Sequence, residues 1–225
     1  MDEGTTSDWN AMRPTMSLGG VGSMSRSGWV VVLCAVLVGI GGTIHALGCD
    51  TALIIIDVQE AFVTEYGWDT TATGRDIVLA VADLLALARS AGIHIAFIQH
   101  LGSPLHTTAE DPRAQFPDAI APLEEERVFP KTNPDAFSID EFVSFLESEQ
   151  VGRLLVCGIA SECVHVTLTT AHLRGYEVIA IADAHATEDG TQEGAASVNE
   201  FWRDTRKMVT PMAEVPWDTY DCSGD

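Results

Sequence analysis

Residues 51–57 of the chain read Thr-Ala-Leu-Ile-Ile-Ile-Asp, and residues 153–158 read Arg-Leu-Leu-Val-Cys-Gly. Both runs are short and rich in apolar side chains, as is typical of parallel strands that are buried on both faces. The first run ends on Asp57, and the second leads into a turn that is followed by Cys163. Because the carboxyl ends of parallel strands meet at one edge of a sheet, we expect these two side chains to meet there.

Strand and helix patterns alternate along the rest of the chain. Apolar residues recur at helical spacing from Ile77 to Ala88 and predict a helix that ends at Gly92. The segment before Lys131 is interpreted as a loop that brings its amine to the same edge of the sheet. Such alternation predicts a doubly wound α/β fold: a mostly parallel sheet with helices on both faces, a Rossmann-like three-layer sandwich. The further elements expected are strands at 93–98 and 176–182, helices around 142–146, at 164–174 and at 192–206, and an edge strand at 207–215 that is broken by Pro211.

The composition is that of an acidic protein with enough apolar residues to form a core. The 225 residues are 46% hydrophobic, and 33 Asp and Glu against 12 Lys and Arg give a formal charge of -21 at pH 7. Such a surface repels phosphates, so we expect no nucleic-acid partner. Lysine occurs only at positions 131 and 207, which makes a lysine inside a motif conspicuous.

The N-terminal region carries an export or membrane signal. No formally charged residue occurs from Ser27 to Gly48, and the apolar core of this stretch runs from Trp29 to Val38. Three interpretations stay open: a cleaved signal sequence, an uncleaved membrane helix, and an extension that is not normally translated. The core is short for a bilayer span of about 20 residues but fits a signal sequence, which favours cleavage. The box Ala46-Leu-Gly-Cys49 also resembles a lipoprotein cleavage site.

These features divide the chain into three predicted parts. They are a disordered leader with a hydrophobic signal or membrane segment at 1–48, a folded domain at 49–216 and a C-terminal tail at 217–225. The protein is expected to be exported or membrane-associated, or cytoplasmic if the extension is not translated. The cysteines that remain after residue 48 are too few for a disulfide scaffold, and a Cys49–Cys222 pair stays open.

Three motifs follow one another at the boundaries of the expected elements. Together, over residues 51–216, they resemble the isochorismatase-like cysteine hydrolases, a family that includes nicotinamidases, carbamoylsarcosine amidases and ureidoacrylate amidases. Any one of the motifs alone would be weak, but three in the family's order and register carry the resemblance. The motifs are Leu53-Ile-Ile-Ile-Asp57-Val-Gln59-Glu-Ala-Phe62, then Val128-Phe-Pro-Lys131 with Asp135-Ala-Phe137, then Gly158-Ile-Ala-Ser-Glu-Cys163-Val-His-Val-Thr167.

The resemblance implies a sheet of six strands and a catalytic triad of Asp57, Lys131 and Cys163. A free thiol has a pKa near 8.5 and is mostly protonated at neutral pH. It becomes a nucleophile when a base such as Asp57 takes its proton or a cation such as Lys131 stabilises the thiolate. In the family, the nucleophile's own N–H and one from the preceding turn hold the oxyanion, often next to a cis peptide; the counterparts are Cys163 and Ala160. Cys157, inside the apolar strand, is interpreted as core packing.

The same resemblance predicts the activity. True isochorismatases cleave a vinyl ether and lack the nucleophilic cysteine, so Cys163 favours amide chemistry. We therefore expect a cysteine-dependent hydrolase that cleaves a C–N bond of a small carboxamide or carbamoyl compound through a thioester intermediate. Gln59 and Phe137 are the further candidates for contacts with the substrate, and Trp68 and Trp202 are candidates for an aromatic pocket wall.

The turn before the cysteine departs from the family pattern. The family usually has one residue between the acid of this turn and the cysteine, whereas Glu162 directly precedes Cys163 here. The missing residue must be absorbed between Gly158 and Glu162, where an oxyanion donor is expected. The alternative function is therefore a catalytically impaired protein that keeps the fold and binds a ligand.

The metal site of the family's nicotinamidases is not recognisable in this sequence. Those enzymes hold a divalent metal with an Asp-x-His pair and a later His after the second strand. The corresponding stretch here reads Gln99-His100-Leu-Gly-Ser-Pro-Leu-His106. We expect no metal, no cofactor and a small-molecule substrate; the resemblance also implies a homo-oligomer, and the N-terminal segment implies possible membrane attachment.

Overall fold

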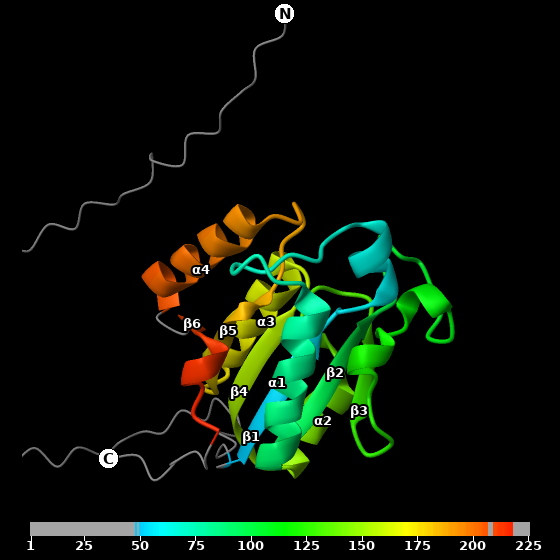
Figure 1. Cartoon of the computed structure of the whole chain (residues 1–225). Coiled ribbons are helices and arrows are strands. Elements are labelled where there is room, and N and C mark those ends of the chain that lie inside the picture. Colours follow the sequence, from blue (N-terminus) through cyan, green and yellow to red (C-terminus); the bar gives the residue numbers. More distant parts are fainter. Residues whose placement is uncertain (1–47, 49, 207–208, 218–225) are drawn as a thin grey trace, which may run out of the picture. The chain divides into compact units, whose positions relative to one another are not determined.

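A six-stranded parallel sheet forms the centre of the computed structural model, which describes residues 48, 50–206 and 209–217 (Figure 1). The strands lie in the order β3-β2-β1-β4-β5-β6, and every pairing between neighbours in this sheet is parallel. The doubly wound sheet predicted from the sequence is confirmed, with parallel pairing throughout rather than only for most strands. The strands are β1 (Asp50–Ile56), β2 (His94–His100), β3 (Arg127–Lys131), β4 (Val151–Gly158), β5 (Glu177–His185) and β6 (Val209–Thr210).

Helices cover both faces of this sheet, which confirms the three-layer arrangement. Side chains alternate along β1, so that Leu53 and Ile55 pack in the layer that contains α1. Ile54 and Ile56 belong to the opposite layer, where α2, α3 and Trp202 of α4 pack. All these side chains of β1 are fully buried, as the continuous apolar run predicts. The helices are α1 (Ile77–Ala91), α2 (Asp140–Ser148), α3 (Ser161–Leu173) and α4 (Gln192–Arg206).

Helix α1 is capped at both ends by residues next to it in the sequence. The side chain of Asp76 accepts hydrogen bonds from the N–H groups of Val78 and Leu79, which would otherwise lack partners. Gly92 ends the helix with φ 69°, a left-handed conformation that glycine adopts without a steric cost. The predicted end of this helix is therefore confirmed.

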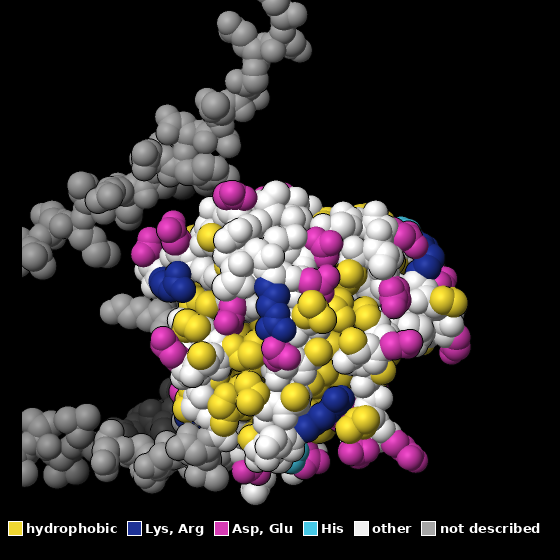
Figure 2. All heavy atoms as spheres, viewed as in Figure 1, with side chains coloured by type: hydrophobic (Ala, Val, Ile, Leu, Met, Phe, Trp, Pro, Cys, Tyr) yellow, Lys and Arg dark blue, Asp and Glu magenta, His cyan; other side chains and the backbone are white. Residues whose placement is uncertain are grey.

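The surface over α1 is both acidic and partly apolar. Figure 2 shows Asp and Glu side chains spread over this face of the domain, with apolar side chains gathered between them. Leu79 and Leu87 of α1 are among the exposed apolar residues.

The candidate site lies where the strand order changes direction. From β1 the chain continues to β2 and β3 on one side of the sheet, and it then crosses to β4, β5 and β6 on the other side. Ile56, the last residue of β1, lies beside Gly158, and the N–H of Ile159 donates to the carbonyl of Ile56 over 2.8 Å. Gly158 has φ 130°, and a Cβ there would collide with the backbone of Ile56. Only glycine allows the two strand ends to approach this closely, and ligands of doubly wound folds bind at such reversal points.

Two elements differ from the sequence-based expectation. Lys131 does not follow a loop but is the last residue of the edge strand β3. Only Phe129 and Lys131 of this strand are buried. The sequence of β3 therefore lacks the run of apolar residues that indicates a strand, and it contains Pro130, which edge strands tolerate. At the other edge, a strand was expected at 207–215; of the described residues 209–215, only Val209–Thr210 form β6, and a short helical turn, Met212–Glu214, follows.

Several predictions fall on residues outside the described part of the chain. They are the leader and hydrophobic segment at 1–48 (of which only residue 48 is described), the lipoprotein-type box, a Cys49–Cys222 pair, and the tail after residue 217. Among the described residues, no helix combines the length and the apolar character that crossing a bilayer requires. The domain boundaries at 49 and 216 stay predictions.

Candidate active site

Asp57 lies directly after β1, at the carboxyl edge of the sheet. Asp57 is 1% exposed. Its backbone has φ 57°, a left-handed conformation that is uncommon for residues other than glycine. Oδ2 accepts a hydrogen bond of 2.7 Å from Lys131 Nζ. Oδ1 is buried and has no hydrogen-bond partner among the described residues. One oxygen of this carboxylate is thus held by a cation, and the other is available to receive a proton.

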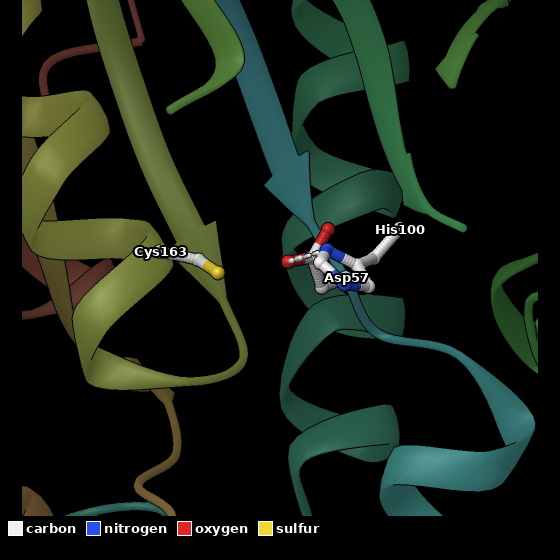
Figure 3. A group of neighbouring side chains, drawn as sticks. All are labelled: Asp57, His100 and Cys163. Atoms are coloured by element: carbon white, nitrogen blue, oxygen red, sulfur yellow. Dashed lines mark ion pairs between the residues drawn. The ribbon is translucent and has the colours of Figure 1, made fainter. Parts of the chain in front are cut away.

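Lys131 brings its ammonium group to the centre of the cluster from the end of β3. Its side chain is fully buried. Besides Asp57, Nζ contacts Cys163 Sγ at 3.4 Å and His100 Nδ1 at 3.3 Å. Figure 3 shows the side chains of Asp57, His100 and Cys163, which come from the ends of β1 and β2 and from the first turn of α3. The structure therefore brings the sequence-predicted residues Asp57, Lys131 and Cys163 together.

Cys163 lies in the first turn of α3 and is half-buried. The peptide between Ile159 and Ala160 is cis, at the place that the family resemblance indicates. Ala160 is the N-cap of α3, so the N–H groups of the following residues point out of the helix end, where they favour negative charge. The turn that is one residue short thus still places the thiol against Lys131.

Glu188, from the segment between β5 and α4, supports this turn. Its Oε2 accepts a hydrogen bond of 2.8 Å from Ser161 Oγ, and its Oε1 accepts one of 3.4 Å from the N–H of Glu162. The N-cap residue Ala160 has no side chain that could do this. A carboxylate from another part of the chain therefore caps α3, a contact that spacing along the sequence cannot reveal.

The electrostatics of the cluster favour a neutral thiol in the resting protein. Burial and, after it, the negative charge of Asp57 raise the pKa of the Cys163 thiol to about 12, against the opposing effect of Lys131. Burial likewise raises the pKa of Asp57, while Lys131 opposes that shift. An ammonium and a carboxylate already balance each other, so a thiolate would add an uncompensated charge. The thiol would then lose its proton only as it reacts.

Gln59 does not have a free amide to offer to a ligand. Its Nε2 donates to the carbonyls of His100 (3.0 Å) and Ala114 (2.9 Å), and its Oε1 accepts from the N–H of His100 (2.6 Å). The side chain is fully buried. The structure therefore gives Gln59 a role in holding the backbone at the end of β2, and the expected substrate contact stays a prediction.

Phe137 is buried in the core layer that also packs against Cys163. Its ring packs against Phe142 and Tyr176, and the guanidinium of Arg174 lies 4.9 Å from its centroid. The substrate contact expected of Phe137 stays a prediction.

Three aromatic side chains, Phe62, Tyr66 and Trp68, form a group beside His100. The ring of Phe62 lies 5.9 Å from that of His100 and stacks on Trp68 at 5.2 Å, and Tyr66 lies 5.0 Å from Trp68. Trp202, by contrast, packs 4.7 Å from His185 in the core. The signal for the aromatic group was the run after Gln59, which contains three aromatic residues within a short distance.

A divalent metal does not fit this cluster while Lys131 is charged. Ligand atoms of Asp57, His100 and Cys163 lie within 4.8 Å of one another, a set that zinc accepts in other proteins. Nζ of Lys131, however, contacts all three atoms and occupies the position that an ion would need. No chemical step is therefore assigned to a metal.

Fold and site together define a doubly wound α/β protein with a buried Asp–Lys–Cys cluster where its chain order reverses. The chain belongs to the isochorismatase domain family, whose model matches residues 51–208. A solved isochorismatase family protein from Desulfovibrio vulgaris subsp. vulgaris str. Hildenborough has a TM-score of 0.63 and 26% identity, covering 74% of this chain and 96% of that one. N-carbamoylsarcosine amidase from Thermoplasma acidophilum, at 16% identity over 74% of this chain and 98% of its own, shares the fold with a TM-score of 0.60.

Curated relatives include enzymes that are named for hydrolysis. A streptothricin hydrolase from Streptomyces noursei is 35% identical over 170 residues, which are 75% of this chain and 64% of that protein. A second streptothricin hydrolase from the same organism is 35% identical over 140 residues, 61% of this chain and 50% of its own length. The chain thus spans less than two thirds of these two relatives. A ureidoacrylate amidohydrolase from Methylorubrum extorquens is 28% identical over 184 residues, 64% of this chain and 74% of that protein.

Proposed function

We propose that the protein is a cysteine-dependent hydrolase that cleaves a C–N bond of a small carboxamide or carbamoyl compound. The observation that carries the proposal is the contact of one buried ammonium with both a carboxylate and a thiol, at 2.7 Å from Asp57 and 3.4 Å from Cys163. The names of the relatives, streptothricin hydrolase and ureidoacrylate amidohydrolase, point to the same class of reaction.

In the proposed reaction, Asp57 takes the thiol proton while Sγ of Cys163 attacks the carbonyl carbon of the substrate. The new S–C bond produces a tetrahedral oxyanion, which the N–H groups at the start of α3 stabilise. The C–N bond then breaks as Asp57 returns the proton to the leaving nitrogen, and a thioester remains. Water, deprotonated by Asp57, attacks the thioester, and the acid and the free thiol are released. Lys131 stays protonated throughout.

Ammonia release from a panel of small carboxamides and carbamoyl compounds tests the activity. The matched control is Cys163→Ser, which replaces the thiol by a hydroxyl of similar shape that is a far weaker nucleophile. Mass spectrometry of the acid-quenched protein during turnover should find an added acyl group on Cys163. Turnover by Cys163→Ser at the wild-type rate would overturn the mechanism.

A ligand-binding protein without activity is the second candidate, and the turn that is one residue short favours it. Under this alternative, no amide in the panel releases ammonia and the protein still unfolds cooperatively. Compounds from the same panel would then raise the Tm without being consumed. The contact between Lys131 and Cys163 speaks for the hydrolase, because a binding protein does not need a thiol beside an ammonium.

A further inference from the structure

His100, the last residue of β2, is the fourth polar group of the cluster. Its side chain is 6% exposed. Its Nδ1 lies 3.3 Å from Lys131 Nζ and 3.9 Å from Asp57 Oδ2, while its Nε2 lies 2.7 Å from the carbonyl oxygen of Ser103. Both ring nitrogens are therefore in contact with a defined partner.

These two contacts determine which nitrogen carries the proton. A carbonyl oxygen can only accept, so Nε2 must donate its hydrogen to Ser103. An ammonium can only donate, so Nδ1 must be the bare acceptor that faces Lys131. His100 is therefore neutral, with its proton on Nε2.

The same contact completes the hydrogen bonding of Lys131. An ammonium has three hydrogens, and Nζ has three partners in the cluster: Asp57, Cys163 and His100. A buried charge without partners is costly, and its position is set by the acceptors that surround it. His100 thus supplies one of the three acceptors that hold the ammonium.

His100 differs from the other two acceptors in what happens to it during turnover. In the proposed reaction, which this inference presupposes, Asp57 carries a proton and Sγ of Cys163 is bonded to the substrate carbon in each of the two tetrahedral intermediates. Both changes weaken the hydrogen bonds to Lys131 at the same stage. The Nδ1 lone pair of His100 is unchanged by these steps, so it can hold Nζ in place when the other two cannot.

We propose that neutral His100 is a positioning residue that keeps the ammonium of Lys131 in place throughout the catalytic cycle. The ring is itself held on several sides. Its backbone is paired with the amide of Gln59, Ser103 fixes Nε2, and the ring of Phe62 packs against it. Gln59 thus contributes to this support through its hydrogen bonds to the backbone of His100.

The first test is spectroscopic and needs no substrate. Two-dimensional 15N NMR of protein labelled at histidine distinguishes the two neutral tautomers, and the signal that disappears in His100→Asn identifies the residue. We expect Nε2 protonated and Nδ1 bare at neutral pH. A protonated Nδ1, or a charged ring at pH 7.5, would overturn the inference whether or not the protein is a hydrolase.

The second test separates positioning from folding. His100→Leu removes the acceptor, whereas His100→Asn keeps an oxygen near the position of Nδ1. We expect His100→Leu to lower kcat roughly 10- to 100-fold, the range that supporting residues show in other sites, with little change in KM. His100→Asn should recover part of that loss. The control is His106→Asn, an exposed histidine with φ 48°, a conformation that asparagine tolerates.

Wild-type kcat in His100→Leu, or equal losses in the leucine and asparagine variants, would overturn the positioning role. If the wild-type protein hydrolyses nothing, the rate of Cys163 alkylation replaces kcat as the readout. A displaced ammonium should change that rate in His100→Leu and not in His106→Asn, and an unchanged rate would contradict the inference.

Discussion

Asp57 and Lys131 are 74 residues apart in the sequence, yet Oδ2 and Nζ lie 2.7 Å apart with both side chains almost completely buried. Removing two charges from water costs free energy, which their attraction and hydrogen bonds must offset. A variant that removes one of the two leaves the other as an unpaired buried charge. Stability and the proposed chemistry therefore depend on the same contact.

Lys131→Met should lower the free energy of unfolding by about 3–5 kcal/mol, because Asp57 would remain buried without its partner. The double variant Asp57→Asn with Lys131→Met should recover much of that loss, because asparagine is uncharged and tolerates the left-handed backbone of residue 57, although this variant should be inactive. Urea unfolding followed by circular dichroism measures both values. A cost below about 1 kcal/mol for Lys131→Met would mean that the pair behaves as an exposed ion pair.

Cys163→Ala should abolish hydrolysis and leave the fold intact, since the thiol is half-buried at the edge of the sheet. The matched variant is Cys157→Ala, which removes a fully buried thiol from β4. It should keep activity and lose about 1 kcal/mol of stability through the small cavity that is left. Turnover assays and thermal unfolding measure the two effects: activity should be lost only in Cys163→Ala, and stability should fall in Cys157→Ala. Loss of activity in both variants would contradict it.

The value of kcat/KM should fall on the acidic side as Asp57 takes up a proton. Asp57 must be ionised to accept the thiol proton, and burial raises its pKa above the usual value. The loss should therefore begin at a higher pH than an exposed aspartate would give. Steady-state assays between pH 4 and 8 measure the profile, with circular dichroism to exclude unfolding. A flat profile down to about pH 4, the ordinary value for aspartate, would rule out Asp57 as the base.

The stability of the fold should fall between about pH 6.5 and pH 4 because of His185. Burial lowers the pKa of this residue to about 4, and its Nε2 lies 3.0 Å from Oδ1 of Asn199. In the unfolded chain His185 binds a proton below about pH 6.5, whereas in the folded chain it stays neutral down to about pH 4. The stability that is present above pH 6.5 is therefore lost as the pH falls through this range. The full difference corresponds to about 3 kcal/mol.

Urea unfolding at pH 7.5 and pH 5 measures this loss. His185→Gln is the suitable variant, because its amide can still donate to Asn199 but does not titrate. The loss of stability between the two pH values should be smaller in the variant. An equal loss would assign the pH dependence to other groups.

Chelators should leave the activity unchanged. The ammonium of Lys131 occupies the centre of the only candidate ligand cluster found in the described part of the chain. Assays with and without EDTA, followed by addition of zinc, measure the effect. Activity that is lost with EDTA and restored by zinc would show that a metal takes part.

Much of the fold followed from local patterns in the sequence. The continuous apolar runs that became β1 and β4, and the capped helix α1, depend on residues close together in the chain. The meeting of Asp57 and Cys163 also followed, because parallel strands leave their carboxyl ends at one edge. The family resemblance added Lys131, whose place could not be derived from its own segment.

The remaining features depend on contacts between distant segments. The strand β3 is short and contains Pro130, so it lacks a recognisable strand pattern. Gln59 was expected to contact substrate, but its partners belong to the backbone of β2 and of the loop near Ala114. Phe137 was assigned by its motif alone, while the residues that it packs against, Phe142 and Tyr176, belong to other segments.

The placement of Lys131 on an outer strand has a consequence for how the protein would fail. Strands at the edge of a sheet open more readily than those at its centre, and such openings cost less free energy than complete unfolding. Each opening of β3 would withdraw the ammonium and let water reach Asp57. Loss of function under mild heating or denaturant would therefore come before loss of the fold, and the two would report on different parts of the same sheet.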